Sequence, residues 1–377
     1  MKYLFSKIKK LFTKKEIQRS PKAKYHRADT FLVLIILTLA GVGILMVYNA
    51  SVSIAIRDFS DQYYFVREQV KWLGIGIVSL ILFSSIDYHR WYKLALPLLL
   101  VTVFLLVAVF VPGFGVRALG ANRWLNFGFF IVQPAEIAKL ALVIYLSAWF
   151  SLKEKGRLGA FLILLGMVVG LVIIEPDLGT AVIILSIAIL LYFLSGAPLW
   201  QFIILIPLFL FGIGGLAVSA PYRFKRLTTF FDPESDPLGA SYQIRQILLA
   251  FGSGGWFGVG IGKSRQKYEY LPEANTDSIF AIIGEELGFI GAAIIIALFL
   301  LLVWRGFRIA KHAPDNFGKY LALGISSWVG IQTIINLSSM VALVPLTGVP
   351  LPLVSYGGSS LIVLLSGLGI LLNISKH

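Results

Sequence analysis

Long runs of apolar residues, separated by short polar breaks, make up the chain from residue 31 to its end. A helix needs about 17–25 mainly apolar residues to cross a bilayer, and ten runs approach or reach this length. They cover residues 31–50, 72–86, 94–111, 134–150, 158–174, 179–194, 199–220, 278–304, 320–343 and 359–373. The pattern predicts an all-α polytopic integral membrane protein with about ten transmembrane helices.

One polar segment is much longer than the others. Residues 221–277 separate the seventh run from the eighth, and connections of this length are usually functional or disordered. We predict a basic tail over residues 1–30 and one membrane domain over residues 31–377 that includes the loop at 221–277. The composition agrees, since 58% of the residues are hydrophobic and 14% are charged. The chain has no cysteine, which excludes disulfide bonds and thiolate metal sites.

Lys and Arg near the ends of the runs predict the orientation, because cytoplasmic loops are enriched in these residues. The first thirty residues contain ten of them, which predicts a cytoplasmic N-terminus. The other predicted cytoplasmic residues are Arg90, Lys93, Lys153, Lys155, Arg157, Arg305, Arg308, Lys311, Lys319 and the C-terminal Lys376. The segments predicted to lie outside are 51–70, 112–133, 175–178, 221–277 and 344–358. The net charge of +14 thus reflects topology, and we expect no nucleic-acid binding.

The long loop at 221–277 mixes basic and aromatic residues. Its basic members are Arg223, Lys225, Arg226, Arg245, Lys263, Arg265 and Lys267. This mixture suits an anionic lipid head group, although interfacial anchoring is an equally good interpretation. The glycine-rich run at 252–264 is not a phosphate-binding loop of the Walker type, because Phe257 stands where that pattern needs glycine. We expect tightly turning or re-entrant backbone there.

Four carboxylates lie where the long loop meets the eighth run. They are Glu273, Asp277, Glu285 and Glu286, and carboxylates at a bilayer boundary often serve chemistry or transport. Asp277 has a second interpretation, since an aspartate just before a helix can be its N-cap. Capping cannot explain Glu285 and Glu286, which lie about two turns further along.

Two shorter motifs place charge next to predicted helices. Pro134 is expected at the first position of a helix, so that Glu136 and Lys139 share a face at a spacing of three. They form either a structural ion pair or a site in which Lys139 meets a pyrophosphate. Asp177 follows Pro176 in a predicted outer turn, where it either caps the next helix or takes part in function.

These motifs together resemble the SEDS family over nearly the whole chain. The matching segments are 120–124 (GANRW), 133–139 (QPAEIAK), 176–180 (PDLGT), 271–280 (LPEANTDSIF), 284–288 (GEELG) and 345–360 (PLTGVPLPLVSYGGSS). Within the family, the basic N-terminal tail and the 271–274 and 284–286 segments are more similar to the division branch than to the elongation branch. Asn275 and Ser278 depart from the family pattern, which commonly has His and Phe there.

The resemblance implies a ten-helix peptidoglycan glycosyltransferase of the bacterial cytoplasmic (inner) membrane. Such a protein polymerises lipid II on the outer side and works with a class B penicillin-binding protein. The division branch adds other divisome membrane proteins as partners and a location at the septum. The family's essential aspartate matches Asp277 in this chain.

The mechanism that follows is an inverting transfer. Asp277 would accept the proton of an acceptor-sugar hydroxyl as that hydroxyl attacks the anomeric carbon of a polyprenyl-pyrophosphate donor. Positively charged side chains would then stabilise the negative charge on the leaving pyrophosphate. The candidate cations are Arg123, Lys139, Arg223 and Arg245; Glu136, Asp177 and Ser355 are further candidate substrate contacts, and Glu285 and Glu286 are supporting candidates. We identify no cofactor with certainty; a divalent cation, Mg²⁺ or Mn²⁺, could share the task, although the sequence shows no metal-ligand set.

Two functions of other classes fit the same pattern. Many spans with acidic and basic residues also suit a lipid II flippase or another transporter of lipid-linked substrates. The clustering of the charged motifs toward the outer face favours interfacial catalysis over transport. A scaffold whose activity resides in its partner is the third interpretation.

Overall fold

The computed structural model describes residues 28–118, 121–128, 130–152, 157–218, 221–232, 240–268 and 270–377. Most of the predicted basic tail therefore lies outside the described residues. The helices are α2 (Thr30–Phe59), α3 (Tyr64–Ser85), α4 (His89–Ala108), α5 (Pro134–Phe150), α6 (Leu158–Ile174), α7 (Leu178–Leu194), α8 (Leu199–Val218), α9 (Pro221–Phe231), α10 (Ala240–Gly254), α11 (Ile279–His312), α12 (Asn316–Met340) and α13 (Gly358–Ile374). Each of the ten predicted apolar runs overlaps one of these helices.

The protein is a multi-pass membrane protein. Within the described residues, α2, α4, α11 and α12 are long and apolar enough to cross a bilayer. The apolar helices α6, α7 and α13 and the first part of α8 are shorter. The bounds of α5 and α6 coincide with the predicted ranges, whereas α2 and α11 extend well beyond theirs. The extensions were missed because they carry polar residues that interrupt the apolar pattern, such as Arg57 and Arg308.

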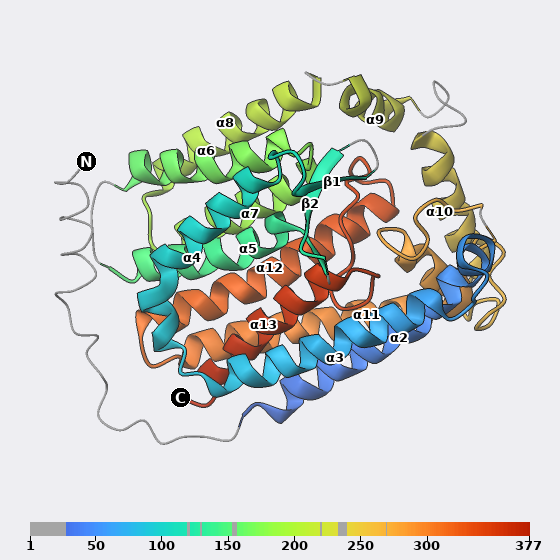
Figure 1. The fold of residues 1–377 in the computed structure, drawn as a ribbon, viewed down its shortest axis with the longest axis horizontal. Helices are drawn as coiled ribbons and strands as arrows, with labels where there is room; N and C mark the ends of the chain where they lie inside the picture. Colours follow the sequence, from blue (N-terminus) through green and yellow to red (C-terminus); the bar gives the residue numbers. More distant parts are fainter. Residues whose placement is uncertain are drawn as a thin grey trace.

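The long helices lie side by side along the long axis of the molecule (Figure 1). α13 packs against α3, and α12 packs against α5, α7 and α11. The backbone N–H of Asp29 donates to Ser375 Oγ at 3.3 Å. The start of α2 and the end of α13 therefore share one end of the bundle, as an even number of crossings requires.

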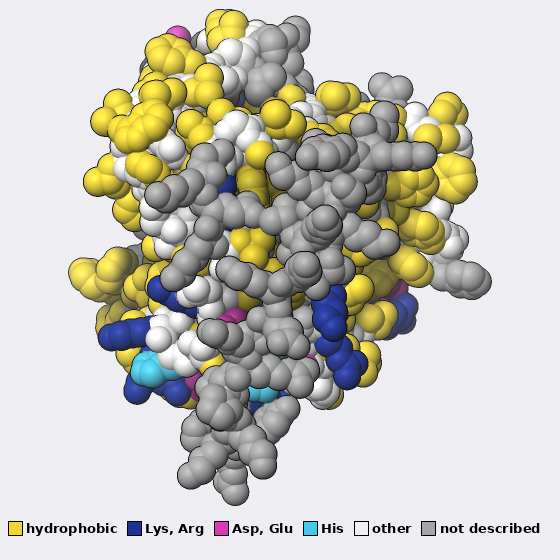
Figure 2. Space-filling view, turned by 90° about the vertical axis from the view of Figure 1, so that its left-hand side faces the viewer, with side chains coloured by type: hydrophobic (Ala, Val, Ile, Leu, Met, Phe, Trp, Pro, Cys, Tyr) yellow, Lys and Arg dark blue, Asp and Glu magenta, His cyan; other side chains and the backbone are white. Residues whose placement is uncertain are grey.

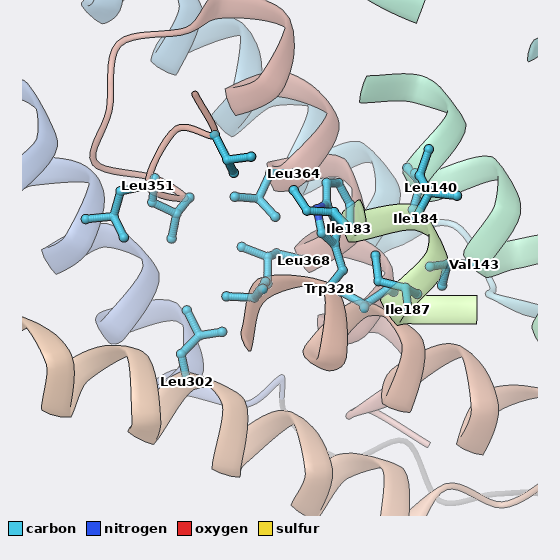
Figure 3. Close-up of a cluster of buried hydrophobic side chains, with 14 of the residues drawn as sticks. Leu140, Val143, Ile183, Ile184, Ile187, Leu302, Trp328, Leu351, Leu364 and Leu368 are labelled. Carbon is cyan, nitrogen blue, oxygen red and sulfur yellow. The ribbon is translucent and has the colours of Figure 1, made fainter. Parts of the chain in front are cut away.

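The core lies where α5, α7, α12 and α13 meet. Trp328 of α12 is 1% exposed and lies among apolar side chains of these helices (Figure 3). The labelled neighbours include Leu140, Val143, Ile183, Ile187, Leu364 and Leu368. Because lipid is as apolar as these side chains, close packing rather than burial from water holds the helices together.

Two regions differ from the sequence predictions. Residues 221–277 are not one loop, because they contain α9 and α10. Both helices are shorter than a membrane span and carry exposed polar residues, so a search for long apolar runs misses them. The segment at 112–133 contains an antiparallel sheet of β1 (Gly115–Ala118), β2 (Ala121–Asn126) and β3 (Ile131–Val132), in that order. The fold is thus helical with one small sheet.

Candidate functional site

Asp277 lies in the turn that leads into α11. The N-cap residue of α11 is Ser278, which makes no side-chain capping bond, so the interpretation of Asp277 as a helix cap was wrong. The Asp277 side chain is buried, with 8% of the residue exposed. Its backbone carbonyl accepts a hydrogen bond of 2.8 Å from Asn336 Nδ2 of α12. The backbone therefore fixes the turn to α12, and the Asp277 carboxylate does not serve as the cap of α11.

Burial raises the pKa of Asp277 to about 7, because an ionised carboxylate loses hydration there. The negative charge of Glu273 raises the pKa further, and the positive charge of Arg226 opposes both effects. Arg226 comes from α9, and its Nη1 donates to the backbone carbonyl of Leu346 at 3.2 Å. A carboxyl group with a pKa near neutrality is suited to exchange protons at physiological pH.

Residues 346–350, which we name the strap, connect the surroundings of Asp277 through their backbone. The Leu346 carbonyl binds Arg226, the Val349 carbonyl accepts from Asn336 Nδ2 at 2.8 Å, and the Pro350 carbonyl accepts from Gln332 Nε2 at 2.9 Å. A Cβ added to Gly179 of α7 would lie 2.7 Å from the Thr347 carbonyl oxygen. α7, α9 and α12 thus meet on one short segment.

Gly348 is the strap residue next to the Asp277 carboxylate. Its φ is +70°, a conformation that glycine adopts without strain. A Cβ at this position would lie 4.0 Å from Asp277 Oδ2. The strap backbone therefore lies beside the Asp277 carboxylate, and glycine adds no side chain of its own at this position.

Glu136 and Lys139 of α5 form the ion pair that their spacing predicts. The distance from Lys139 Nζ to Glu136 Oε1 is 2.8 Å, and the two residues are 1% and 3% exposed. Lys139 Nζ also donates to Gln332 Oε1 at 3.0 Å. Because Gln332 binds the strap, the ion pair is joined to the surroundings of Asp277 by two hydrogen bonds. This geometry favours the structural interpretation of Lys139.

Arg123 of β2 and Asp177 meet at the turn between α6 and α7. Asp177 is the N-cap of α7, with its Oδ1 accepting from Thr180 N at 3.0 Å, so the capping interpretation is confirmed. Arg123 Nε donates to the Glu175 backbone carbonyl at 3.1 Å, and its Nη2 donates to the Pro176 carbonyl. Both residues therefore shape the turn.

Glu175, in the same turn, was not among the predicted site residues. It is 0% exposed, and neither carboxylate oxygen has a hydrogen-bond partner in the described part of the chain. Burial and the neighbouring Asp177 raise the pKa of Glu175 to about 8, against the effect of Arg123. The sequence offered no signal beyond its position next to Pro176, because its burial comes from packing.

Glu285 and Glu286 hold the glycine-rich loop against α11. Glu285 accepts from Ser264 Oγ and from Arg265 N, the latter at 3.0 Å. Glu286 Oε1 lies 3.3 Å from Lys267 Nζ, and its Oε2 accepts from Asn49 of α2 at 3.2 Å. Their partners come from this loop and from α2, so their supporting role is to fix the loop.

The same loop pairs with a break in α11 at Gly288. Gly288 has a φ of +67°, which interrupts the helix. The loop amides of Val259 and Gly260 donate to the carbonyls of Glu285 and Glu286 at 3.0 and 3.1 Å. The prediction of tightly turning glycine-rich backbone is confirmed, and the pairing satisfies backbone groups that the break leaves without helical partners.

The remaining candidates do not converge on Asp277. Ser355 Oγ accepts from Leu351 N at 2.8 Å, which braces the segment after the strap. Arg245 is exposed on α10, and the side chain of Arg223 lies outside the described part. Across the residues that the structure describes, no three His, Asp or Glu side chains come together as metal ligands. The sequence missed Arg226 as the cation facing Asp277, although it belongs to the basic set of the loop.

Relatives of this chain span almost its full length. It is 43% identical to stage V sporulation protein E of Bacillus subtilis (strain 168), over 93% of this chain and 97% of that protein. It is 41% identical to a probable peptidoglycan glycosyltransferase FtsW of Geobacter sp. (strain M18), over the same shares of the two chains.

Solved structures share the fold. A chain from a study of the structural coordination of polymerization and crosslinking by a peptidoglycan synthase complex superposes with a TM-score of 0.76, 28% identity and coverage of 93% of this chain and 98% of that one. The rod shape determining protein RodA of Thermus thermophilus superposes with a TM-score of 0.69 and 28% identity, over 93% of this chain and 97% of that one. The family model described as "Cell cycle protein" matches residues 29–377, and the chain therefore belongs to the FtsW/RodA/SpoVE family, the SEDS family.

Proposed function

We propose that this protein is a peptidoglycan glycosyltransferase that polymerises lipid II, with Asp277 as the general base. The observation that carries this proposal is the Asp277 carboxylate, which is buried, has a pKa raised to about 7 and faces Arg226. The similarity to proteins named as peptidoglycan glycosyltransferases supports the substrate class.

The reaction needs one base and one positively charged group. Asp277 Oδ2 lies next to Gly348 of the strap, and in this proposal an acceptor-sugar hydroxyl approaches this oxygen and gives up its proton. The hydroxyl oxygen forms a bond to the anomeric carbon of the donor, and the bond to the pyrophosphate oxygen breaks. Pyrophosphate is a good leaving group, so no general acid is required, and direct displacement inverts the anomeric centre.

Arg226 is the best-placed cation to stabilise the negative charge of the leaving pyrophosphate. It faces Asp277 and is exposed on α9, so a diphosphate can reach it. Arg226 is the cation whose charge acts on Asp277, whereas Arg123 binds the turn after α6 and Lys139 is paired with Glu136, so these two are second candidates. No step is assigned to a divalent cation, because among the described residues no set of three acidic or histidine ligands converges.

The catalytic end faces the outside of the cytoplasmic membrane in this proposal. Figure 2 looks at the opposite end of the molecule, where Lys and Arg side chains gather. The exposed basic residues of the turns near that end include Arg90, Lys93, Lys311 and Lys319. At the end nearer Asp277, Arg57 and Lys71 pair with Asp58 and Glu68. Exposed positive charge in these short turns fits the cytoplasmic side.

The partner proposed for the chain is a class B penicillin-binding protein, which would crosslink the strands that this protein makes. The similarity to a chain from a peptidoglycan synthase complex supports this pairing. The relatives named FtsW and the sporulation relative suggest work at a septum, together with other divisome proteins.

The test is polymerisation of purified lipid II by the chain together with its cognate penicillin-binding protein. We expect Asp277→Asn to lower the rate by about 100-fold or more, because the amide cannot accept the proton. Asp58→Asn is the matched control, since Asp58 is exposed and pairs with its neighbour Arg57. The control should retain the wild-type rate.

Two outcomes would count against the proposal. Glycan strands formed at the wild-type rate by Asp277→Asn would remove Asp277 from the chemistry. Lipid II crossing protein-only vesicles at a rate independent of Asp277, without any polymer, would favour transport instead. Thermal unfolding of both variants in detergent checks that they are folded.

A further inference from the structure

The proton that Asp277 accepts must leave before the next turnover. Asp277 is 8% exposed, so direct access to water is restricted. The Thr276 hydroxyl lies 3.4 Å from Asp277 Oδ1 and 2.8 Å from Glu273 Oε2. Glu273 is exposed. A hydroxyl group therefore stands between the buried carboxyl and one that is open to solvent.

The backbone holds these three groups in place. The Glu273 carbonyl accepts from Thr276 N at 3.2 Å and from Ser278 N at 3.1 Å. Glu273 also has a φ of +51°, a conformation that is uncommon for a residue with a side chain and persists only where the surroundings enforce it. The turn thus fixes the order of Glu273, Thr276 and Asp277.

We propose that Thr276 and Glu273 form a proton relay that carries the proton from Asp277 to solvent. This inference rests on the proposed role of Asp277 as the base. A Cβ at Gly348 of the strap would lie 4.0 Å from Asp277 Oδ2, whereas Oδ1 lies 3.4 Å from the Thr276 hydroxyl. The two oxygens can therefore serve substrate and relay respectively.

The relay moves one proton and changes no other bond. After the transfer, the carboxyl group turns so that its O–H points at Thr276 Oγ1. This O–H bond breaks as a new one forms at Thr276 Oγ1, which passes its own hydrogen to Glu273 Oε2. Glu273 releases this proton to water, and Asp277 is again an ionised base. A hydroxyl suits the middle position because it donates and accepts at once.

The neighbouring groups agree with this direction of transfer. From its own segment, Glu273 places a negative charge near Asp277, and from α9, Arg226 places a positive one. The strap contributes Gly348 and α12 contributes Asn336, neither of which titrates. Glu273 is therefore the nearby acceptor for a proton leaving this pocket.

The experiment measures lipid II polymerisation by the chain with its cognate penicillin-binding protein at low buffer concentration. We expect Thr276→Val, which keeps the shape and removes the hydroxyl, to lower kcat by about tenfold or more with an unchanged KM. We expect the same of Glu273→Gln. Thr276→Ser keeps the hydroxyl and should recover most of the rate. Glu68→Gln, at a surface ion pair with Lys71, is the control.

Added imidazole separates a relay from a merely structural role. A small buffer can carry the proton directly, so it should restore the rate of Thr276→Val and Glu273→Gln while leaving the wild type unchanged. A wild-type polymerisation rate of Thr276→Val at low buffer concentration would overturn the relay. A lowered rate of either relay variant that imidazole does not restore would overturn it as well.

Asp277→Asn in the same assay separates the two proposals. If Asp277→Asn is inactive and the relay variants match the wild type, the relay alone is wrong. If Asp277→Asn is fully active, the base assignment is wrong and the relay falls with it.

Discussion

Asp277 is poised between two opposite charges. Glu273 raises its pKa and Arg226 lowers it, while burial sets the overall value of about 7. The ionised form is the base, so activity should rise as pH increases through this pKa. The balance matters because a pKa far above neutrality would leave too little base, and one far below would make the base weak.

Removing Arg226 should raise the pKa of Asp277. In Arg226→Gln the ionised carboxylate loses a favourable neighbour, so the pKa rises and the acid limb of the pH–rate profile moves to higher pH. Arg226 is exposed, so added salt should reduce the difference from the wild type. The measurement is the pH dependence of lipid II polymerisation at two salt concentrations. Lys225→Gln, one residue earlier in α9, is the control.

A shift of the acid limb to lower pH in Arg226→Gln would contradict this picture. An equal shift in Lys225→Gln would show that general surface charge is responsible. A lower maximal rate in addition to the shift is expected, because Arg226 is also the first candidate to hold the departing pyrophosphate.

At the scale of elements, α11 is two helical pieces joined by a break. The piece before Gly288 begins directly after the Asp277 turn, and the piece after it runs on to His312. The loop amides of Val259 and Gly260 bind the carbonyls at the break. The loop and the break therefore stabilise each other and fix the first piece of α11.

Gly288→Ala should destabilise the protein. Alanine has a Cβ, which would lie 2.7 Å from the Phe257 backbone nitrogen, and the φ of +67° is strained for any residue but glycine. Strain of this kind costs about 1–3 kcal/mol. Thermal unfolding in detergent should show a lower midpoint than the wild type.

Gly170→Ala in α6 is the matched control. A Cβ at Gly170 meets nothing within 4 Å, and alanine favours a helix interior over glycine by about 0.5–1 kcal/mol. Its midpoint should be equal to or above that of the wild type. Equal midpoints for wild type and Gly288→Ala would mean that the break is not a fixed feature.

At the scale of the molecule, the start of α2 and the end of α13 lie at the same end of the bundle. The described start of the chain lies at the end where Arg305 Nε binds Asp29 Oδ2 at 2.5 Å, and the C-terminal Ser375 lies beside it. Asp277 lies just before the start of α11, at the other end of the bundle. Outer catalysis therefore requires both of these chain ends to be cytoplasmic.

Cysteine labelling can test this orientation, because the chain has no cysteine of its own. Ser60→Cys lies just after α2, at the end proposed to be outside, and Ala313→Cys lies just after α11. An impermeant thiol reagent should label the first in intact cells and the second only after the membrane is opened. The reverse pattern would invert the topology and remove the outer location of Asp277.

The apolar runs predicted the helices of the bundle well, because a bilayer demands length and hydropathy that are visible in sequence. α9 and α10 are too short to cross a bilayer and carry exposed polar residues, so the sequence pattern did not predict them. The spacing of Glu136 and Lys139 predicted their ion pair, since it depends on one helix alone. Neither the cation facing Asp277 nor the burial of Glu175 could be predicted, because both depend on how distant segments pack.

The strap holds its neighbours by backbone carbonyls rather than by side chains. The number of residues in the strap therefore matters as well as their identity. An inserted or deleted residue would offset every carbonyl from Arg226, Asn336 and Gln332 at once. The length of this segment is therefore expected to be constrained in relatives, in addition to the residues that match the family pattern.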